Sequence, residues 1–175
     1  MEWMLLPLKR YAEFNGRSRR MEFWMWVLFT VIVSIVLGVI DNLLGFSTSR
    51  STLTTSSTGA AFSTFSSMGI LGGLWSLGTL IPSIAVGVRR LHDTGRSGWW
   101  ILLPLGPYIL GILFVVMGAV SGSLALAGLG GVLTLIGLVC AIVLIVFYCL
   151  PGTPGPNKYG PDPMGGAANL NETFS

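Results

Sequence analysis

Long runs of apolar residues, separated by short polar segments, dominate the pattern of this chain. Four of these runs have the length of roughly 20 residues that crosses a hydrocarbon core. We predict transmembrane helices over about 23–44, 68–88, 99–120 and 124–150. A segment surrounded by lipid must satisfy its own backbone hydrogen bonds, which favours α-helix for every run. The predicted fold class is therefore all-α, a polytopic transmembrane helix bundle with four spans.

The last two predicted spans come from one apolar block, which extends from Trp99 to Leu150 and is too long for a single helix. Its middle, residues 118–131, is rich in Gly, Ser and Ala and predicts a turn near residues 121–123. No Asp, Glu, Lys or Arg occurs in the sequence between Arg96 and Lys158. Such a charge-free stretch is long enough for two spans.

The segments outside the spans have different compositions. Residues 1–22 mix aromatic and aliphatic residues with Lys and Arg, which is typical of an interfacial segment that lies on the headgroups. Residues 46–67 are mostly Ser and Thr with one charge, Arg50, and predict a flexible loop. We expect residues 1–163 to form a single membrane domain, followed by a flexible tail at 164–175.

Composition supports a membrane protein and excludes an ordinary soluble domain. The chain is 52% hydrophobic and only 10% charged, with a mean hydropathy of +0.75. Soluble domains carry about 25% charged residues, which this chain lacks. The net charge of +3 is too small to suggest a nucleic-acid partner. The first apolar piece, Trp3 to Leu8, is too short for a cleaved signal peptide, so we expect the first span to be retained.

The distribution of Lys and Arg predicts the orientation of the spans. Residues 1–22 contain five basic residues, the 41–67 segment contains one, and the 89–98 segment contains three. Because cytoplasmic loops carry the excess of Lys and Arg, we expect the N-terminus and the 89–98 segment to face the cytoplasm. The Ser/Thr-rich segment then faces outward, and four spans return the tail to the cytoplasmic side.

Three polar clusters stand out because polar residues are scarce. They read GRSRRMEFW at 16–24, RRLHDTGRSGWW at 89–100 and PGTPGPNKYGPDP at 151–163. In these three motifs and their order, the chain from about Tyr11 to Pro163 resembles the bacterial membrane family of domain of unknown function 805. The resemblance implies a small multi-pass protein of the bacterial cytoplasmic (inner) membrane, and it implies no known reaction.

The clusters do not predict an active site. His92 next to Asp93 has the chemistry of an acid–base pair, but no Ser or Cys nucleophile accompanies it in a recognisable motif. A lone His is not a metal site, which needs three or four ligands. Cys140 and Cys149 lie in one apolar run and are expected to be small packing residues. We expect no enzyme activity, no metal and no cofactor.

Two interpretations of the arginines remain open. They are either topology signals, with His92, Asp93 and Thr94 capping helix ends or pairing with them, or contacts to anionic lipid headgroups. Arginine favours the second interpretation because its guanidinium presents a planar fork of donors that matches phosphate. The candidate headgroup contacts are Arg17, Arg19, Arg20, Arg89, Arg90, His92 and Arg96.

The function that we favour at this level is a structural or accessory protein that binds anionic phospholipid or a membrane partner. The alternatives are a small transporter or channel component and, less favoured, a lipid-modifying enzyme. A transporter needs ionisable groups inside the membrane, and Asp41 lies only at the edge of its span. Expected partners are membrane lipids, a second copy of the chain or another membrane protein, and no nucleic acid.

Small residues are expected where helices touch. In lipid there is no hydrophobic driving force for helix association, so it depends on close packing of the backbones. Gly69 and Gly73 form a G-x-x-x-G pair, which we predict as a close helix contact. Gly118 and Gly122 form another, which falls at the predicted turn.

Overall fold

The computed structural model describes residues 2–55 and 61–164, and side chains within 4–46 and 69–164. In these residues four helical segments are long and apolar enough to cross a membrane, which confirms the predicted spans. They are α2 (Arg20–Leu43), α3 (Ile70–Asp93), the 3-10 helix η1 (Gly98–Leu102) with α4 (Leu105–Ser121), and α5 (Leu124–Cys149). A short helix, α1 (Glu2–Lys9), precedes them within the predicted interfacial segment. Of the predicted tail 164–175, all but Met164 lies outside the described residues.

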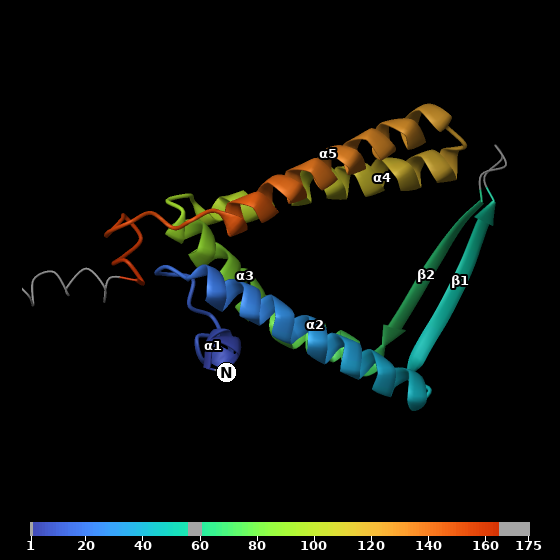
Figure 1. The fold of residues 1–175 in the computed structure, drawn as a ribbon. Helices are drawn as coiled ribbons and strands as arrows, with labels where there is room; N and C mark the ends of the chain where they lie inside the picture. Colours follow the sequence, from blue (N-terminus) through green and yellow to red (C-terminus); the bar gives the residue numbers. More distant parts are fainter. Residues whose placement is uncertain (1, 56–60, 165–175) are drawn as a thin grey trace, which may run out of the picture.

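The four long helices form two helical hairpins, α2–α3 and α4–α5. Figure 1 shows these hairpins as the arms of an open V, in contact at the end where α2 begins and α3 and α5 end. The buried apolar cluster lies at this junction and includes Phe23 and Trp26 of α2, Leu91 of α3 and Tyr148 of α5. The arms are therefore held together at one end, where the polar clusters also lie.

The α4–α5 hairpin is packed through glycines. A Cβ added to Gly111 or Gly118 of α4 would lie 2.8 Å or less from backbone atoms of α5. Gly130 and Gly137 of α5 make the reciprocal approaches to α4, at 2.5 and 3.1 Å from backbone nitrogens. Each pair is seven residues apart, so both glycines of a helix face the neighbouring helix. Gly122 ends α4 with φ at 68°, which confirms the predicted turn.

The predicted contact through Gly69 and Gly73 is wrong. A Cβ on Gly73 would meet nothing within 4 Å, so this position faces away from the other described helices. Gly69 instead lies against Asp41 of α2, whose carboxylate occupies the space that a Cβ would need. The spacing is the same in a facing pair and in an outward pair, so the motif alone could not separate them.

Asp41 caps a neighbouring helix. Its Oδ1 accepts a hydrogen bond from Leu71 N at 3.1 Å, and its Oδ2 accepts one from Gly72 N at 2.9 Å. The first N–H groups of a helix have no intrahelical acceptor, and a negative charge there interacts favourably with the helix dipole. Asp41 is 1% exposed and ties the end of α2 to the start of α3.

The segment between α2 and α3 differs from its prediction. Instead of a flexible loop at 46–67, the structure has two antiparallel strands, β1 (Ser47–Thr55) and β2 (Ala61–Gly69), paired from Ser47↔Gly69 to Thr55↔Ala61. Threonine is β-branched and favours extended backbone, a preference that the low-complexity composition concealed. This pair of strands begins at the end of α2 and returns to the start of α3, at the ends of these helices opposite the junction (Figure 1).

Candidate functional site

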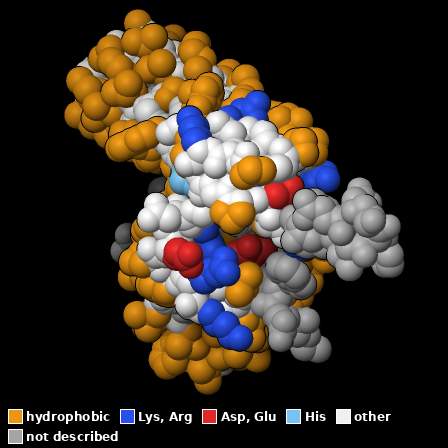
Figure 2. Space-filling model, turned by 90° about the vertical axis from the view of Figure 1, so that its left-hand side faces the viewer, with side chains coloured by type: hydrophobic (Ala, Val, Ile, Leu, Met, Phe, Trp, Pro, Cys, Tyr) orange, Lys and Arg blue, Asp and Glu red, His pale blue; other side chains and the backbone are white. Residues whose placement is uncertain are grey.

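The three polar clusters of the sequence meet at one end of the bundle. We define the polar end as residues 15–22, 89–98 and 150–163. Because α2 begins at Arg20, α3 ends at Asp93 and α5 ends at Cys149, the helix ends bring the three segments together. Figure 2 shows charged side chains gathered on this face, with hydrophobic side chains around them.

Asp93 is the centre of the polar end. Its Oδ1 accepts from Arg17 Nε at 2.9 Å, and its Oδ2 accepts from an Nη of Arg90. The Asp93 carbonyl accepts from the backbone N–H of Thr153 at 2.8 Å and from its hydroxyl at 3.1 Å. The side chain of Asp93 is 6% exposed, so one buried residue joins the segment before α2, the end of α3 and the segment after α5.

Arginines also cap the end of α5. Arg90 donates to the carbonyls of Tyr148, at 3.1 Å, and Leu150, while Arg20 donates to Cys149 O at 3.4 Å. The last carbonyls of a helix lack intrahelical donors, and cations are favourable there. Through these bonds α3 and α2 fix the position of the second arm.

Arg17 extends the same network to the C-terminal segment. Its two Nη atoms donate to Gly155 O at 2.6 Å and Thr153 O at 2.5 Å. With its bond to Asp93, the guanidinium therefore contacts protein acceptors on three sides. Arg17 thus holds residues 153–155 against the end of α3.

Arg89 points to a different neighbour from Arg90. Its guanidinium lies 3.4 Å from Glu22 Oε1, and its carbonyl accepts from Ser18 N at 3.1 Å. Both side chains of this ion pair are buried, at 0% and 4% exposure. Arg89 therefore ties the end of α3 to the first turn of α2.

His92 is held between two segments. Its Nδ1 lies 3.3 Å from Gly16 O, and its ring stacks on Tyr159 with centroids 3.9 Å apart and planes 5° from parallel. Its carbonyl accepts from Asn157 Nδ2 at 3.0 Å. His92 is thus a fixed, half-buried side chain and a contact for the C-terminal segment.

These positions revise the list of candidate headgroup contacts. The predicted loop at 89–98 is helical as far as Asp93, because the charged residues pair inside the protein rather than ending the helix. Arg89 and Arg90 are 0% exposed, and a headgroup outside the protein does not reach them. Arg20 is exposed and Arg19, whose guanidinium donates to Pro163 O, is half-buried. Arg96 lies over the Phe147 ring at 4.0 Å and is also half-buried.

A cavity of about 210 Å³ lies beside Arg17, Arg19 and Arg20, and the C-terminal segment forms another of its walls. Asp162 contributes to its wall and accepts from the backbone N–H groups of Gly155, at 3.0 Å, and Met164, at 2.8 Å. These two hydrogen bonds hold the pKa of Asp162 below its usual range. The lining contains three arginines and two aspartates, Asp93 and Asp162, so positive charge is in excess.

Comparison with known proteins identifies the family. A family model described as "Protein of unknown function (DUF805)" matches residues 11–161. The chain belongs to the DUF805 family. This confirms the resemblance seen in the three motifs. No solved structure matches the chain significantly.

Two relatives of this DUF805 protein cover almost its whole length. The inner membrane protein YhaH of Escherichia coli (strain K12) is 36% identical over 93% of this chain and 97% of its own. The inner membrane protein YhaI of the same organism is 34% identical over 95% and 99%. With four candidate spans, the DUF805 protein described here is an integral, multi-pass inner membrane protein.

The family match includes the polar end almost completely. The C-terminal motif of this DUF805 protein is recognisable in the sequence, but no role was predicted for its individual residues. In the structure Thr153, Asn157, Tyr159 and Asp162 hold the segment in place. The available signal was the presence of hydrogen-bonding and aromatic side chains between closely spaced prolines, directly after an apolar span.

Proposed function

We propose that this protein is an accessory membrane protein that binds the phosphate of an anionic phospholipid in the cavity beside Arg17, Arg19 and Arg20. The observation that carries the proposal is the arginine lining of this cavity at the start of a membrane span. Arginine forks match phosphate oxygens, and each basic residue near an anionic leaflet contributes about 1 kcal/mol of attraction.

The depth of the cavity supports a headgroup as the ligand. Trp24 and Trp100 are exposed close to the polar end, and Trp99 is 78% exposed. Tryptophan is enriched at the level of the headgroups, so these three side chains favour an interfacial position for the cavity. The excess of Lys and Arg in residues 1–22 and 89–98 favours the cytoplasmic leaflet, with the N-terminus inside.

The arginines have different parts in this proposal. Arg17 is fixed by Asp93 and presents one wall of the cavity. Arg20 makes one hydrogen bond within the described residues, at 3.4 Å, and a guanidinium has five N–H donors. Arg20 therefore supplies donors that a phosphate would meet, Arg19 adds its positive charge to the lining, and Arg89 and Arg90 are left out.

The acidic residues of the spans support a binding protein over a transporter or channel component. A transport pathway needs ionisable groups that a passing ion can meet. Within the described residues, each acidic residue of the long helices is already engaged. Glu22 pairs with Arg89, Asp41 caps α3, and Asp93 binds Arg17 and Arg90.

The test compares Arg with Lys at the cavity. The full chain with Arg19→Lys and Arg20→Lys would be placed in bilayer discs of phosphatidylcholine with a minor fraction of phosphatidylglycerol. Retained phosphatidylglycerol would be measured by native mass spectrometry. We expect a roughly tenfold loss, because one hydrogen bond to a charged group contributes about 1.5 kcal/mol.

The matched control is Arg10→Lys, since Arg10 is exposed, pairs with Glu13 and lies outside the cavity. A reporter at the C-terminus would verify unchanged topology in each variant. Equal retention in the double variant and the control would overturn the proposal and leave Arg19 and Arg20 as topology signals. The same purification reports whether a second copy or another membrane protein accompanies the chain.

A further inference from the structure

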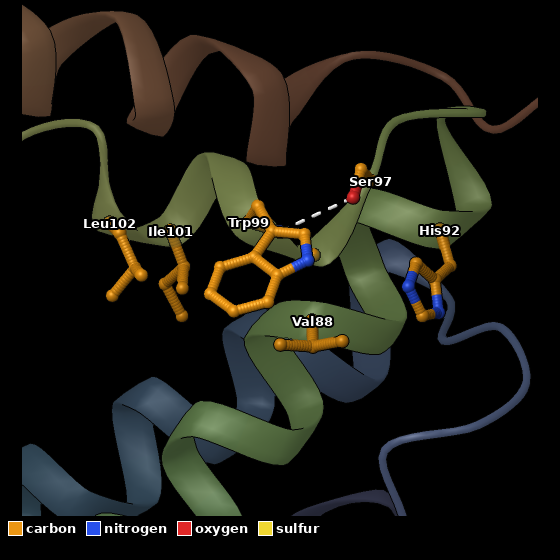
Figure 3. Close-up of a pocket in the computed structure, with 7 residues that line it drawn as sticks. Val88, His92, Ser97, Trp99, Ile101 and Leu102 are labelled. Atoms are coloured by element: carbon orange, nitrogen blue, oxygen red, sulfur yellow. Dashed lines mark hydrogen bonds between the residues drawn. The ribbon is translucent and has the colours of Figure 1, made fainter.

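A second pocket, of about 370 Å³, lies on another side of the α3 end, between α3 and η1. Figure 3 shows the aliphatic side chains of Val88, Ile101 and Leu102 along one side of the pocket. The polar side chains of His92 and Ser97 lie at its other end. A mostly apolar cavity with a few polar groups at one place is the usual form of a small-molecule site.

The pocket borders a cleft between the two arms. A neighbouring cavity of about 390 Å³ shares Ile101 and Leu102 as walls and extends to Ile84 of α3 and to α5. On α5 it is lined by Gly137 and Ala141, which are one helical turn apart. We define the groove as these two adjacent cavities; its polar groups lie at the His92 end. Apart from Ser97, the residues that line the groove belong to candidate membrane spans.

The His92 ring determines which polar group fits this end. A carbonyl oxygen only accepts, so the contact with Gly16 O places a proton on Nδ1. In the neutral ring Nε2 then carries no proton and acts as an acceptor. Nε2 lies 3.5 Å from the position of a Cβ on Gly98, a residue of the pocket wall, and stacking on Tyr159 fixes the ring.

We propose that this groove binds a neutral lipid with a hydroxyl at its head, of the glyceride or long-chain alcohol class. The hydroxyl donates to His92 Nε2, and the hydrocarbon chain occupies the cleft beside Gly137 and Ala141. The arginine-lined cavity selects negative charge, whereas this groove offers an acceptor at a largely apolar site. The two sites share no lining residue.

The test uses two probes that differ only in the hydroxyl. The full chain in phosphatidylcholine discs would be exposed to a diacylglycerol with a photoreactive diazirine on one acyl chain, or to its methyl ether. Crosslinks would be mapped by mass spectrometry. We expect the free hydroxyl to label the groove segments 98–105 and 137–141 roughly fivefold more than the ether does, because one neutral hydrogen bond of about 1 kcal/mol gives that factor.

Substitutions in the protein test the contact with the lipid hydroxyl and the contact with the acyl chain separately. His92→Phe retains an aromatic ring against Tyr159 and removes Nε2, so the preference for the hydroxyl should vanish. Ala141→Phe fills the cleft and should abolish labelling by both probes, while the matched Val139→Phe, at a position 59% exposed and outside the groove, should not.

Equal labelling by the two probes in the unmodified protein would overturn the proposal, even if a variant fails to fold. Equal labelling of Ala141→Phe and Val139→Phe would do the same. Arg19→Lys with Arg20→Lys should leave groove labelling unchanged, so failure of the phospholipid proposal and failure of this one give different results.

Discussion

The hydroxyl of Tyr11 donates a hydrogen bond to the backbone carbonyl of Gly78, at 2.7 Å. Pro82 lies four residues after Gly78 in α3 and has no N–H to give that carbonyl its normal helical partner. The segment after α1 therefore completes the hydrogen bonding of a membrane helix. Proline is tolerated in such helices when neighbouring groups satisfy the freed carbonyl.

Removing the Tyr11 hydroxyl should destabilise the protein. We expect Tyr11→Phe to lower the free energy of unfolding by about 1 kcal/mol, because an unpaired carbonyl beside lipid is costly. Thermal unfolding in mild detergent would measure it. In a Pro82→Ala background alanine supplies the N–H, so the same change should cost less. Additive effects of the two substitutions would show that Tyr11 does not serve this carbonyl.

The contact between α4 and α5 gives a second prediction. Gly130→Leu should separate the helices and lower the melting temperature, because a Cβ there would lie 2.5 Å from Val115 N. Gly128→Leu is the matched control on the same helix, where a Cβ meets nothing within 4 Å. If the two variants have the same melting temperature, the close contact at Gly130 does not stabilise this hairpin.

The glycines also show where sequence reasoning succeeds and fails. Length and hydropathy predicted all four spans, because the bilayer imposes one requirement on every crossing segment. Contacts between helices depend on which face each residue presents, and a chain that contains 24 glycines offers many equivalent motifs. The prediction of a close helix contact at Gly69 and Gly73 is therefore wrong. The close contacts at Gly111 and Gly130 were not predicted.

The arginines of the first two motifs were predicted to face the same leaflet, but the third motif was not predicted to join them in one site. Their composition marked them, yet nothing local in the sequence indicates that Asp93 binds Arg17, which is 76 residues away. For a related reason the predicted span ended at about residue 88, whereas α3 continues to Asp93. Buried pairing of Arg89 with Glu22 and of Arg90 with Asp93 allows charges to continue a helix that hydropathy alone would end.

Asp93 should be the most sensitive residue of the polar end. In Asp93→Asn, Arg17 and Arg90 would remain buried without a carboxylate, and breaking a buried ion pair costs roughly 3–5 kcal/mol. We expect a strongly lowered melting temperature and faster proteolysis within 150–163. Glu13→Gln removes the exposed Arg10 pair and should cost about 0–1 kcal/mol. Similar losses in both variants would contradict a central role for Asp93.

Asp162 provides a prediction about pH, since its carboxylate accepts from Gly155 N and Met164 N. These bonds favour the charged form and lower its pKa in the folded protein. Its contribution is therefore fully present above the ordinary aspartate pKa of about 3.9 and is lost as pH falls through the lowered value. The amide NMR shifts of Gly155 and Met164 should titrate together, with one midpoint below about 3.9. Asp162→Asn should abolish both titrations. Separate or higher midpoints would show that this carboxylate does not hold the C-terminal segment that forms one wall of the arginine-lined cavity.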